Sequence, residues 1–264
     1  MRPHARVRGI DQNAVMTANP AAPTAAATPT PVRTEWIAVP TAGGTMDAWL
    51  AVPPAGRGPG LLLLQEIFGV NAHIRAVAEQ YALAGFCVVA PDLFWRQAPH
   101  VELGYVGAER ERALALMRTV ARDEVVADMQ ATLAALRARP ECGDRVGAIG
   151  YCMGGRLAFT AAALCGVDAA VCYYGGGIAT QLELAPKVAC PIQFHHAEQD
   201  ASIPADAVAA VQAAMAASPA AAVAEFHHYA GAQHGFNCWA RAAYHPASAA
   251  LALGRSVAHL GRLF

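Results

Sequence analysis

The sequence has almost no net charge and no segment of the kind that crosses a membrane. Its 19 basic and 20 acidic residues give a formal charge of −1, so no basic surplus favours nucleic acid or a lipid surface. No apolar stretch is long enough to span a bilayer. The N-terminal segment also lacks the apolar run and small-residue cleavage site of a signal peptide. We therefore expect a cytoplasmic protein that binds neither nucleic acid nor a membrane.

The cysteines lack the spacing of a metal site or a disulfide framework. There are seven, an odd number, and none forms a Cys-x-x-Cys pair. The pairs His195-His196 and His227-His228 raise the question of a metal instead. Neighbouring strand residues point to opposite faces, so neither pair can chelate one ion. We expect no metal and no cofactor, and we expect most thiols to behave as buried hydrophobes in a reducing compartment.

The start of the chain offers little to bury. Residues 17–31 are mostly Ala, Pro and Thr, a composition typical of disorder, and Met16 is an alternative start. We predict a disordered tail over residues 1–34. The whole chain is 55% apolar and 15% charged, which is a globular composition, and residues 35–264 are predicted to form one domain.

Strand-like and helix-like segments alternate from Glu35 onward. Strands are expected at 35–39, 46–52, 60–65, 86–90, 145–149, 169–173, 191–195 and 225–229, the first two as an antiparallel hairpin. Helices are expected at 74–84, 108–119, 123–139, 155–164, 205–216 and 246–260. The helix over 123–139 carries an apolar stripe at helical spacing, formed by Val125, Val126, Met129, Leu133 and Leu136. The alternation predicts an α/β domain with a mostly parallel central sheet flanked by helices.

The most informative motif is Gly150-Tyr151-Cys152-Met153-Gly154-Gly155, between the strand at 145–149 and a helix-forming stretch. This is the pattern of a nucleophile elbow, in which glycines allow a sharp turn and the central side chain stands exposed above the sheet. The helix N-terminus favours negative charge, so a cysteine there is shifted toward the nucleophilic thiolate. The motif indicates an acyl-transfer hydrolase with Cys152 as nucleophile.

A nucleophile of this kind needs a base and an acid, which follow it in the order acid, then histidine. Asp200 lies just past the strand at 191–195, and His234 lies in a glycine-flanked loop after the strand at 225–229. We predict the triad Cys152, Asp200 and His234. Glu198 and Asp206 remain alternatives for the acid. Asp200 could instead cap the helix that begins near residue 205, although Ser202 is nearer to that position.

One carboxylate upstream is ambiguous on position alone. Glu66 follows the buried strand Leu61–Leu64, where it is either a solvated loop charge or a member of the site.

These segments together resemble the dienelactone hydrolase family. The resemblance covers residues 35–264 and is carried by Gln65-Glu66-Ile67-Phe68-Gly69-Val70-Asn71, Ala90-Pro91-Asp92-Leu93 with Arg96, the elbow, Tyr173-Tyr174-Gly175, Asp200 and Gly231-x-x-His234-Gly-Phe. It implies an α/β-hydrolase fold, and Cys152, Asp200 and His234 match the family's nucleophile, acid and base.

The resemblance also implies roles for further residues. Glu66 matches a glutamate that contacts the resting nucleophile and helps to form the thiolate. The backbone N–H groups of Ile67 and Met153 match the oxyanion hole, and Arg96 matches an arginine that grips the substrate carboxylate.

One position departs from the family pattern. Chlorocatechol-pathway members have a second carboxylate-binding arginine four residues after the histidine, where this chain has Cys238, and Arg241 follows three residues later. Arg241 either reaches the same space or leaves the carboxylate clamp incomplete, which puts dienelactone itself in doubt as the substrate.

The expected function is hydrolysis of an enol-lactone or activated ester through a Cys-His-Asp triad and a thioester acyl-enzyme, in aromatic compound degradation. The expected partner is that small molecule, and the chain is expected to be a monomer or weak homo-oligomer. Two alternatives stay open. The glycines at 147, 150, 154 and 155 could belong to a dinucleotide-binding dehydrogenase, although the G-x-G-x-x-G spacing is absent. Cys152 could also serve a non-catalytic redox sensor.

Overall fold

The computed structural model describes residues 31–264, so the predicted tail over residues 1–34 lies almost wholly outside the described part. All of the expected strands and helices are present. The strands are β1 (Arg33–Thr41), β2 (Gly44–Val52), β3 (Gly58–Leu64), β4 (Cys87–Pro91), β5 (Cys142–Tyr151), β6 (Ala169–Tyr173), β7 (Ile192–Ala197) and β8 (Ala224–Tyr229). The helices are α1 (Ala72–Leu83), α2 (Gly107–Thr119), α3 (Arg122–Arg137), α4 (Met153–Leu164), α5 (Ala205–Ala216) and α6 (Pro246–Leu260).

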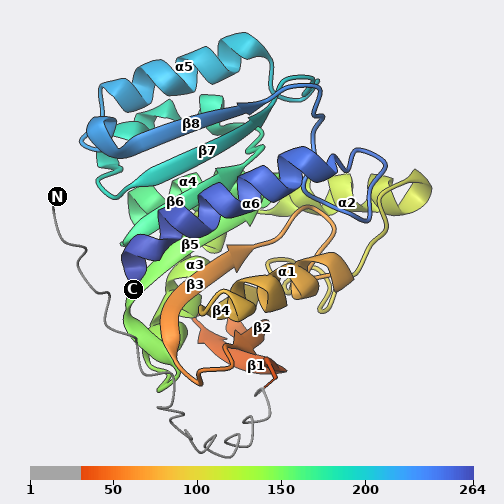
Figure 1. Ribbon diagram of the computed structural model, residues 1–264. Coiled ribbons are helices and arrows are strands. Elements are labelled where there is room, and N and C mark those ends of the chain that lie inside the picture. Colours follow the sequence, from red (N-terminus) through yellow and green to blue (C-terminus); the bar gives the residue numbers. More distant parts are fainter. Residues whose placement is uncertain (1–30) are drawn as a thin grey trace, which may run out of the picture.

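The strands form one sheet in the order β1-β2-β4-β3-β5-β6-β7-β8. β2 is antiparallel to both β1 and β4, and every other neighbouring pair is parallel. Helices α1 and α6 cover one face, while α3, α4 and α5 pack on the other (Figure 1). This is the α/β-hydrolase arrangement that the sequence predicts.

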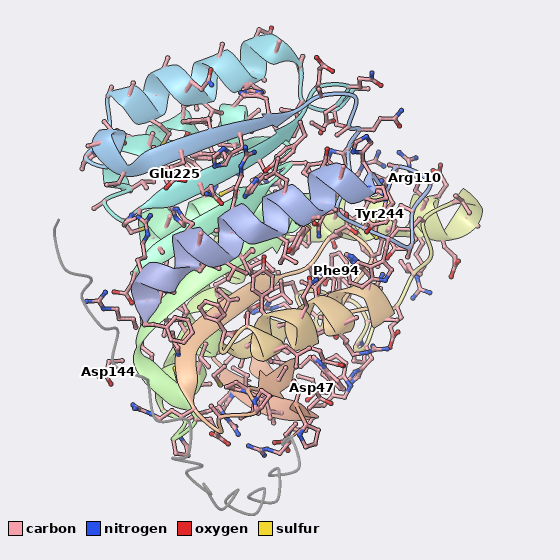
Figure 2. All side chains as sticks on the ribbon, in the orientation of Figure 1. Asp47, Phe94, Arg110, Asp144, Glu225 and Tyr244 are labelled. Atoms are coloured by element: carbon pink, nitrogen blue, oxygen red, sulfur yellow. The ribbon has the colours of Figure 1, made fainter. Side chains whose placement is uncertain are left out.

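Alternation along the strands explains why both faces are covered. In β3, Leu62 and Leu64 belong to the core under α3 and α4, while Leu61 and Leu63 belong to the core under α1 and α6. All four leucines are fully buried. A strand with two apolar faces is stable only between two layers of helices. Side chains fill the space between these layers (Figure 2).

The predicted apolar stripe of α3 faces the core. Val125, Met129, Leu133 and Leu136 are buried and Val126 is partly buried against the same cluster. The helix also buries Asp128 and Thr132, which the apolar pattern does not reveal.

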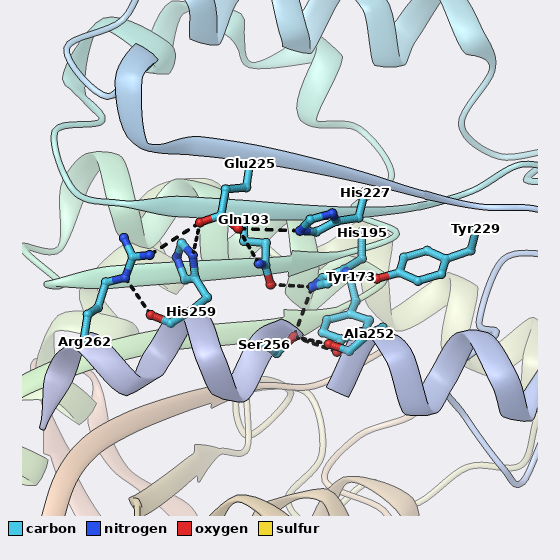
Figure 3. A network of polar contacts seen from close by, with 10 residues as sticks. All are labelled: Tyr173, Gln193, His195, Glu225, His227, Tyr229, Ala252, Ser256, His259 and Arg262. Carbon is cyan, nitrogen blue, oxygen red and sulfur yellow. Dashed lines mark hydrogen bonds and ion pairs between the residues drawn. The ribbon is translucent and has the colours of Figure 1, made fainter. Parts of the chain in front are cut away.

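Within each histidine pair the two side chains point to opposite faces of the sheet, as expected: His195 lies beside His227 on one face, and His196 lies beside His228 on the other. His195 faces α6, where its ring contacts Tyr229 Oη at 2.7 Å, Gln193 Oε1 at 2.8 Å and Ser256 Oγ at 3.0 Å (Figure 3). His196 stacks on Phe194 and Phe226 on the other face. The same network holds α6 against the sheet, since Ser256 Oγ also lies 2.7 Å from Tyr173 Oη.

The parallel strands bring distant residues to one edge. Glu66, Cys152, Asp200 and His234 follow the carboxyl ends of β3, β5, β7 and β8. In open α/β sheets ligands bind at this edge. No helix in residues 31–264 combines the length and apolarity needed to cross a bilayer.

Candidate active site

Cys152 sits in a strained backbone conformation, with φ 56° and ψ −115°, as the residue that caps α4. Its N–H donates to the Tyr173 carbonyl at 3.0 Å, which ties the turn to β6. The turn is closed by backbone contacts. A Cβ on Gly154 would lie 2.0 Å from the Leu64 carbonyl oxygen. Strain of this kind persists only where the surroundings enforce it, and it is typical of catalytic turns.

Asp200 and His234 form the pair that the sequence predicts. His234 Nδ1 lies 2.8 Å from Asp200 Oδ2, and Asp200 Oδ1 accepts the Ser202 N–H at 2.8 Å. The Asp200 carboxylate is buried, so its negative charge is directed at the imidazole rather than at solvent. The two alternative acids lie elsewhere: Glu198 accepts the Gly231 N–H and Asp206 accepts the Ala207 N–H.

The surroundings of His234 favour its charged form. Burial, the largest influence, lowers the pKa of His234, but hydrogen bonds to Asp200 and Cys152 outweigh burial and raise this pKa to about 10. A protonated imidazole beside the nucleophile is the partner that a thiolate requires.

Glu66 is buried and paired with an arginine. Arg241 Nη1 donates to Glu66 Oε1 at 3.0 Å, while Glu66 Oε2 has no hydrogen-bond partner among the described residues. Burial raises the pKa of Glu66, and Arg241 and His234 oppose this rise. Glu66 is therefore a buried charge rather than a solvated one, but it is not among the residues that line the cavity, and its contact with Cys152 stays a prediction.

A cavity of about 310 Å³ opens beside Cys152. Its lining includes Ile67, Cys152, Met153, Arg156, His234 and Arg241. The two residues expected to supply the oxyanion hole thus border the same space as Cys152 and His234. Further lining side chains come from α2, among them Arg110, which Figure 2 labels.

Arg96 is not among the lining residues. Its guanidinium pairs with both oxygens of Asp128, with Nη2 2.9 Å from Oδ1, and stacks over the Trp95 ring at 4.4 Å. Asp128 is buried, and Trp95 Nε1 also donates to it at 3.0 Å. The role of Arg96 in substrate binding stays a prediction.

Two arginines in the cavity were not found from the sequence. Burial lowers the pKa of Arg156, whose Nε has no partner among the described residues. The sequence could have predicted that Arg156 lies near Cys152, because residues four apart lie on the same side of a helix. Arg110 carries no such signal, since it reaches the cavity only through the path of the loop before α2.

Comparisons with known proteins give one consistent result. The model of the dienelactone hydrolase family matches residues 46–264. A carboxymethylenebutenolidase of Pseudomonas sp. (strain P51) is 35% identical over 232 residues, covering 87% of this chain and 96% of that protein. Carboxymethylenebutenolidase 1 of Cupriavidus pinatubonensis (strain JMP 134 / LMG 1197) is 40% identical over 159 residues, 60% of this chain and 68% of that protein.

Among solved structures, a protein of Klebsiella pneumoniae subsp. pneumoniae MGH 78578, provisionally assigned as a dienelactone hydrolase, matches with a TM-score of 0.76 and 29% identity. The match covers 88% of this chain and 99% of that one.

Proposed function

The chain belongs to the dienelactone hydrolase family, and from that membership we propose that it hydrolyses an enol-lactone or activated ester through Cys152, His234 and Asp200. Membership makes the chain a hydrolase that acts on esters or lactones. The matched region includes the glycine-rich turn, so a dinucleotide-binding role loses its support. The observation that carries the proposal is the Asp200–His234 pair at 2.8 Å beside Cys152 in one cavity.

In the first step the Cys152 thiolate attacks the acyl carbon. The oxyanion that forms is stabilised by the N–H groups of Ile67 and Met153, whose residues border the cavity on either side of the nucleophile. Collapse breaks the acyl–oxygen bond and expels an enolate, leaving a thioester on Cys152. An enolate departs without strong acid assistance, which favours enol-lactones and activated esters over plain alkyl esters.

In the second step water attacks the thioester, with His234 as general base and Asp200 orienting the ring. A histidine with a pKa near 10 holds its proton at neutral pH and is a poor base. Formation of the thioester removes the negative charge from Cys152, which is one of the influences that raise this pKa. Acylation therefore lowers the pKa of His234, whose proton passes to the released enolate or to solvent, and the neutral ring can then accept a proton from the attacking water.

The cavity suits a substrate with an anionic group. Arg156 and Arg241 both border it, and guanidinium groups match a carboxylate in shape and charge. Arg241 keeps Glu66 as a partner, whereas Arg156 Nε has none among the described residues. We assign the substrate carboxylate to these two arginines, with the sequence-predicted Arg96 as the alternative.

All seven cysteines are free thiols, which supports a reducing, cytoplasmic location.

The test is kcat/KM on dienelactone, with 4-nitrophenyl acetate as a neutral ester, for the unchanged chain and for Cys152→Ala. We expect turnover of both esters by the unchanged chain and its loss in the variant, since no other thiol lies at the elbow. Full activity of Cys152→Ala would remove the thiol from the mechanism. Mass spectrometry of the unchanged chain, quenched with acid during turnover of 4-nitrophenyl acetate, should show an acetyl group on Cys152 that Cys152→Ala lacks.

A further inference from the structure

A second cluster of titratable side chains consists of Glu66, His73 and Cys238, none of which lines the cavity beside Cys152. Glu66 from the loop after β3, His73 from the first turn of α1 and Cys238 from the loop after β8 each offer one ligand atom, and these atoms all lie within 4.8 Å of one another. All three residues are at least 97% buried. The triad does not use His73 or Cys238.

The cluster leaves polar atoms unsatisfied. Within residues 31–264, neither ring nitrogen of His73 has a hydrogen-bond partner, and neither does Glu66 Oε2. The Asn237 carbonyl influences the pKa of His73 without forming a hydrogen bond of good geometry. Leaving a buried polar group unpaired costs about 1–3 kcal/mol, so such groups call for a partner. Here one ring nitrogen of His73 lies within 4.8 Å of both a Glu66 carboxylate oxygen and the Cys238 sulfur.

These three donors match one class of ion. Thiolate, imidazole and carboxylate are the ligands of Zn²⁺, with bonds of about 2.0–2.3 Å to each. Three protein ligands leave one position of a tetrahedron open. A thiolate and a carboxylate carry two negative charges that attract the ion, and the Arg241 guanidinium that pairs with Glu66 Oε1 leaves one positive charge over the whole cluster.

We propose that Glu66, His73 and Cys238 form a Zn²⁺ site, with water in the fourth position, that ties the loop after β3, the start of α1 and the loop after β8 together. The hydrolysis proposed above assigns no step to Glu66, so the site does not rest on the proposed function; a Glu66 bound to the ion would not also take the part in forming the thiolate that the family resemblance implies. The sequence does not reveal this site, because Cys238 is far from Glu66 and His73 in the chain and only the adjacent histidine pairs suggested a metal.

Protonation sets how the site binds. Imidazole coordinates in its neutral form and cysteine as the thiolate, so the Cys238 thiol must release its proton as the Zn–S bond forms. Binding is therefore expected to strengthen as the pH rises.

The experiment must exclude the nucleophile, because Cys152 and His234 could hold a metal themselves. We would use the full chain carrying Cys152→Ser and His234→Ala, and titrate it with Zn²⁺ against a chromophoric chelator until equilibrium. The expected result is one Zn²⁺ per chain and a higher midpoint of thermal unfolding with Zn²⁺ than with EDTA, since an ion that binds only the folded state stabilises it.

Three further substitutions in that background locate the ion. Cys238→Ser and His73→Phe should each weaken binding on the order of 100-fold, and Cys190→Ala, which removes a half-buried thiol outside the cluster, should not. Co²⁺ in place of Zn²⁺ should give a thiolate-to-metal absorption band that Cys238→Ser abolishes. Circular dichroism checks that each variant is folded. If His73→Phe does not fold, Cys238→Ser, which replaces only the sulfur atom, still provides the test.

No binding to the background variant would overturn the proposal. So would binding that survives both Cys238→Ser and His73→Phe, or a cobalt spectrum without the thiolate band. Because the background variant has no nucleophile, none of these outcomes depends on whether the chain hydrolyses esters.

Discussion

Arg241 Nη1 lies 3.0 Å from Glu66 Oε1, which joins the loop after β8 to the loop after β3. The position of Arg241 matters because the sequence departs from the family pattern: Cys238 stands where chlorocatechol-pathway members have a second carboxylate-binding arginine. Arg241, three residues later, brings a guanidinium to the border of the cavity. Of the two outcomes left open by the sequence, the structure favours the one in which Arg241 reaches the site.

The path of Arg241 depends on Gly235, so Gly235→Ala should impair substrate binding. A Cβ there would lie 2.4 Å from Arg241 Nη1, and the φ of +85° is itself unfavourable for alanine. We expect kcat/KM on dienelactone to fall about tenfold or more, corresponding to about 1.4 kcal/mol or more of lost binding, with a smaller effect on 4-nitrophenyl acetate. Gly231→Ala is the control, since its φ of +68° brings similar strain with nothing within 4 Å. Equal losses in both variants would point to backbone strain alone.

Arg156 and Arg96 can be separated by their effects on two substrates. Arg156→Met should raise KM for dienelactone about 10- to 100-fold, equivalent to about 1.4–2.8 kcal/mol, and leave 4-nitrophenyl acetate nearly unchanged. Arg96→Met should instead lower stability by about 3–5 kcal/mol, because buried Asp128 loses its charged partner. Urea unfolding and steady-state kinetics on both variants give the answer. A selective loss of dienelactone turnover in Arg96→Met, without destabilisation, would favour the sequence-based assignment.

Buried His196 should make stability depend on pH between about 6.5 and 4. Burial lowers its pKa to about 4 from a usual value of 6.5, so in this range the unfolded chain binds a proton that the folded chain does not. Stability from this group is therefore complete above pH 6.5 and lost as the pH falls, by about 1.4 kcal/mol per unit. His196→Phe, which keeps a ring between Phe194 and Phe226, should flatten the profile by that slope. Parallel profiles for the two proteins would contradict the prediction.

The hydroxyl groups of Ser256 and Tyr173 should be energetically coupled, so that removing one of them alone destabilises the protein. Ser256→Ala leaves the buried Tyr173 hydroxyl without its partner at 2.7 Å and should cost about 1–3 kcal/mol. Adding Tyr173→Phe removes both polar groups, and the double variant should be less destabilised than the sum of the single variants. Chemical denaturation of the four proteins measures this. Additive losses would mean that the two hydroxyls do not interact.

The sequence predicted those parts of the protein that depend on local pattern. Every expected helix and strand is present, because apolar periodicity and glycine turns act over short distances. The triad order is also a local signal, since Asp200 and His234 each follow a strand end and parallel strands bring those ends together.

Side-chain pairing between distant segments was not predictable in this way. Arg96 has a family motif but lies on Asp128, a buried residue of α3 that the apolar stripe conceals. Arg110 lies on α2, whose place beside the cavity depends on the irregular segment between β4 and α2. His73 and Cys238 meet Glu66 only after the loop after β8 has packed against the loop after β3 and the start of α1. In each case the outcome depends on tertiary packing, which no spacing within one segment encodes.

The contact of Gly154 with the Leu64 carbonyl joins α4 to β3 through backbone atoms alone. Packing between side chains can adapt to substitution, but this one contact has no side chain to change. The positions of Ile67 and Met153, which lie close to Leu64 and Gly154 in the chain, are therefore insulated from substitutions in the core. We therefore expect changes in substrate preference to arise from substitutions of the arginines that line the cavity.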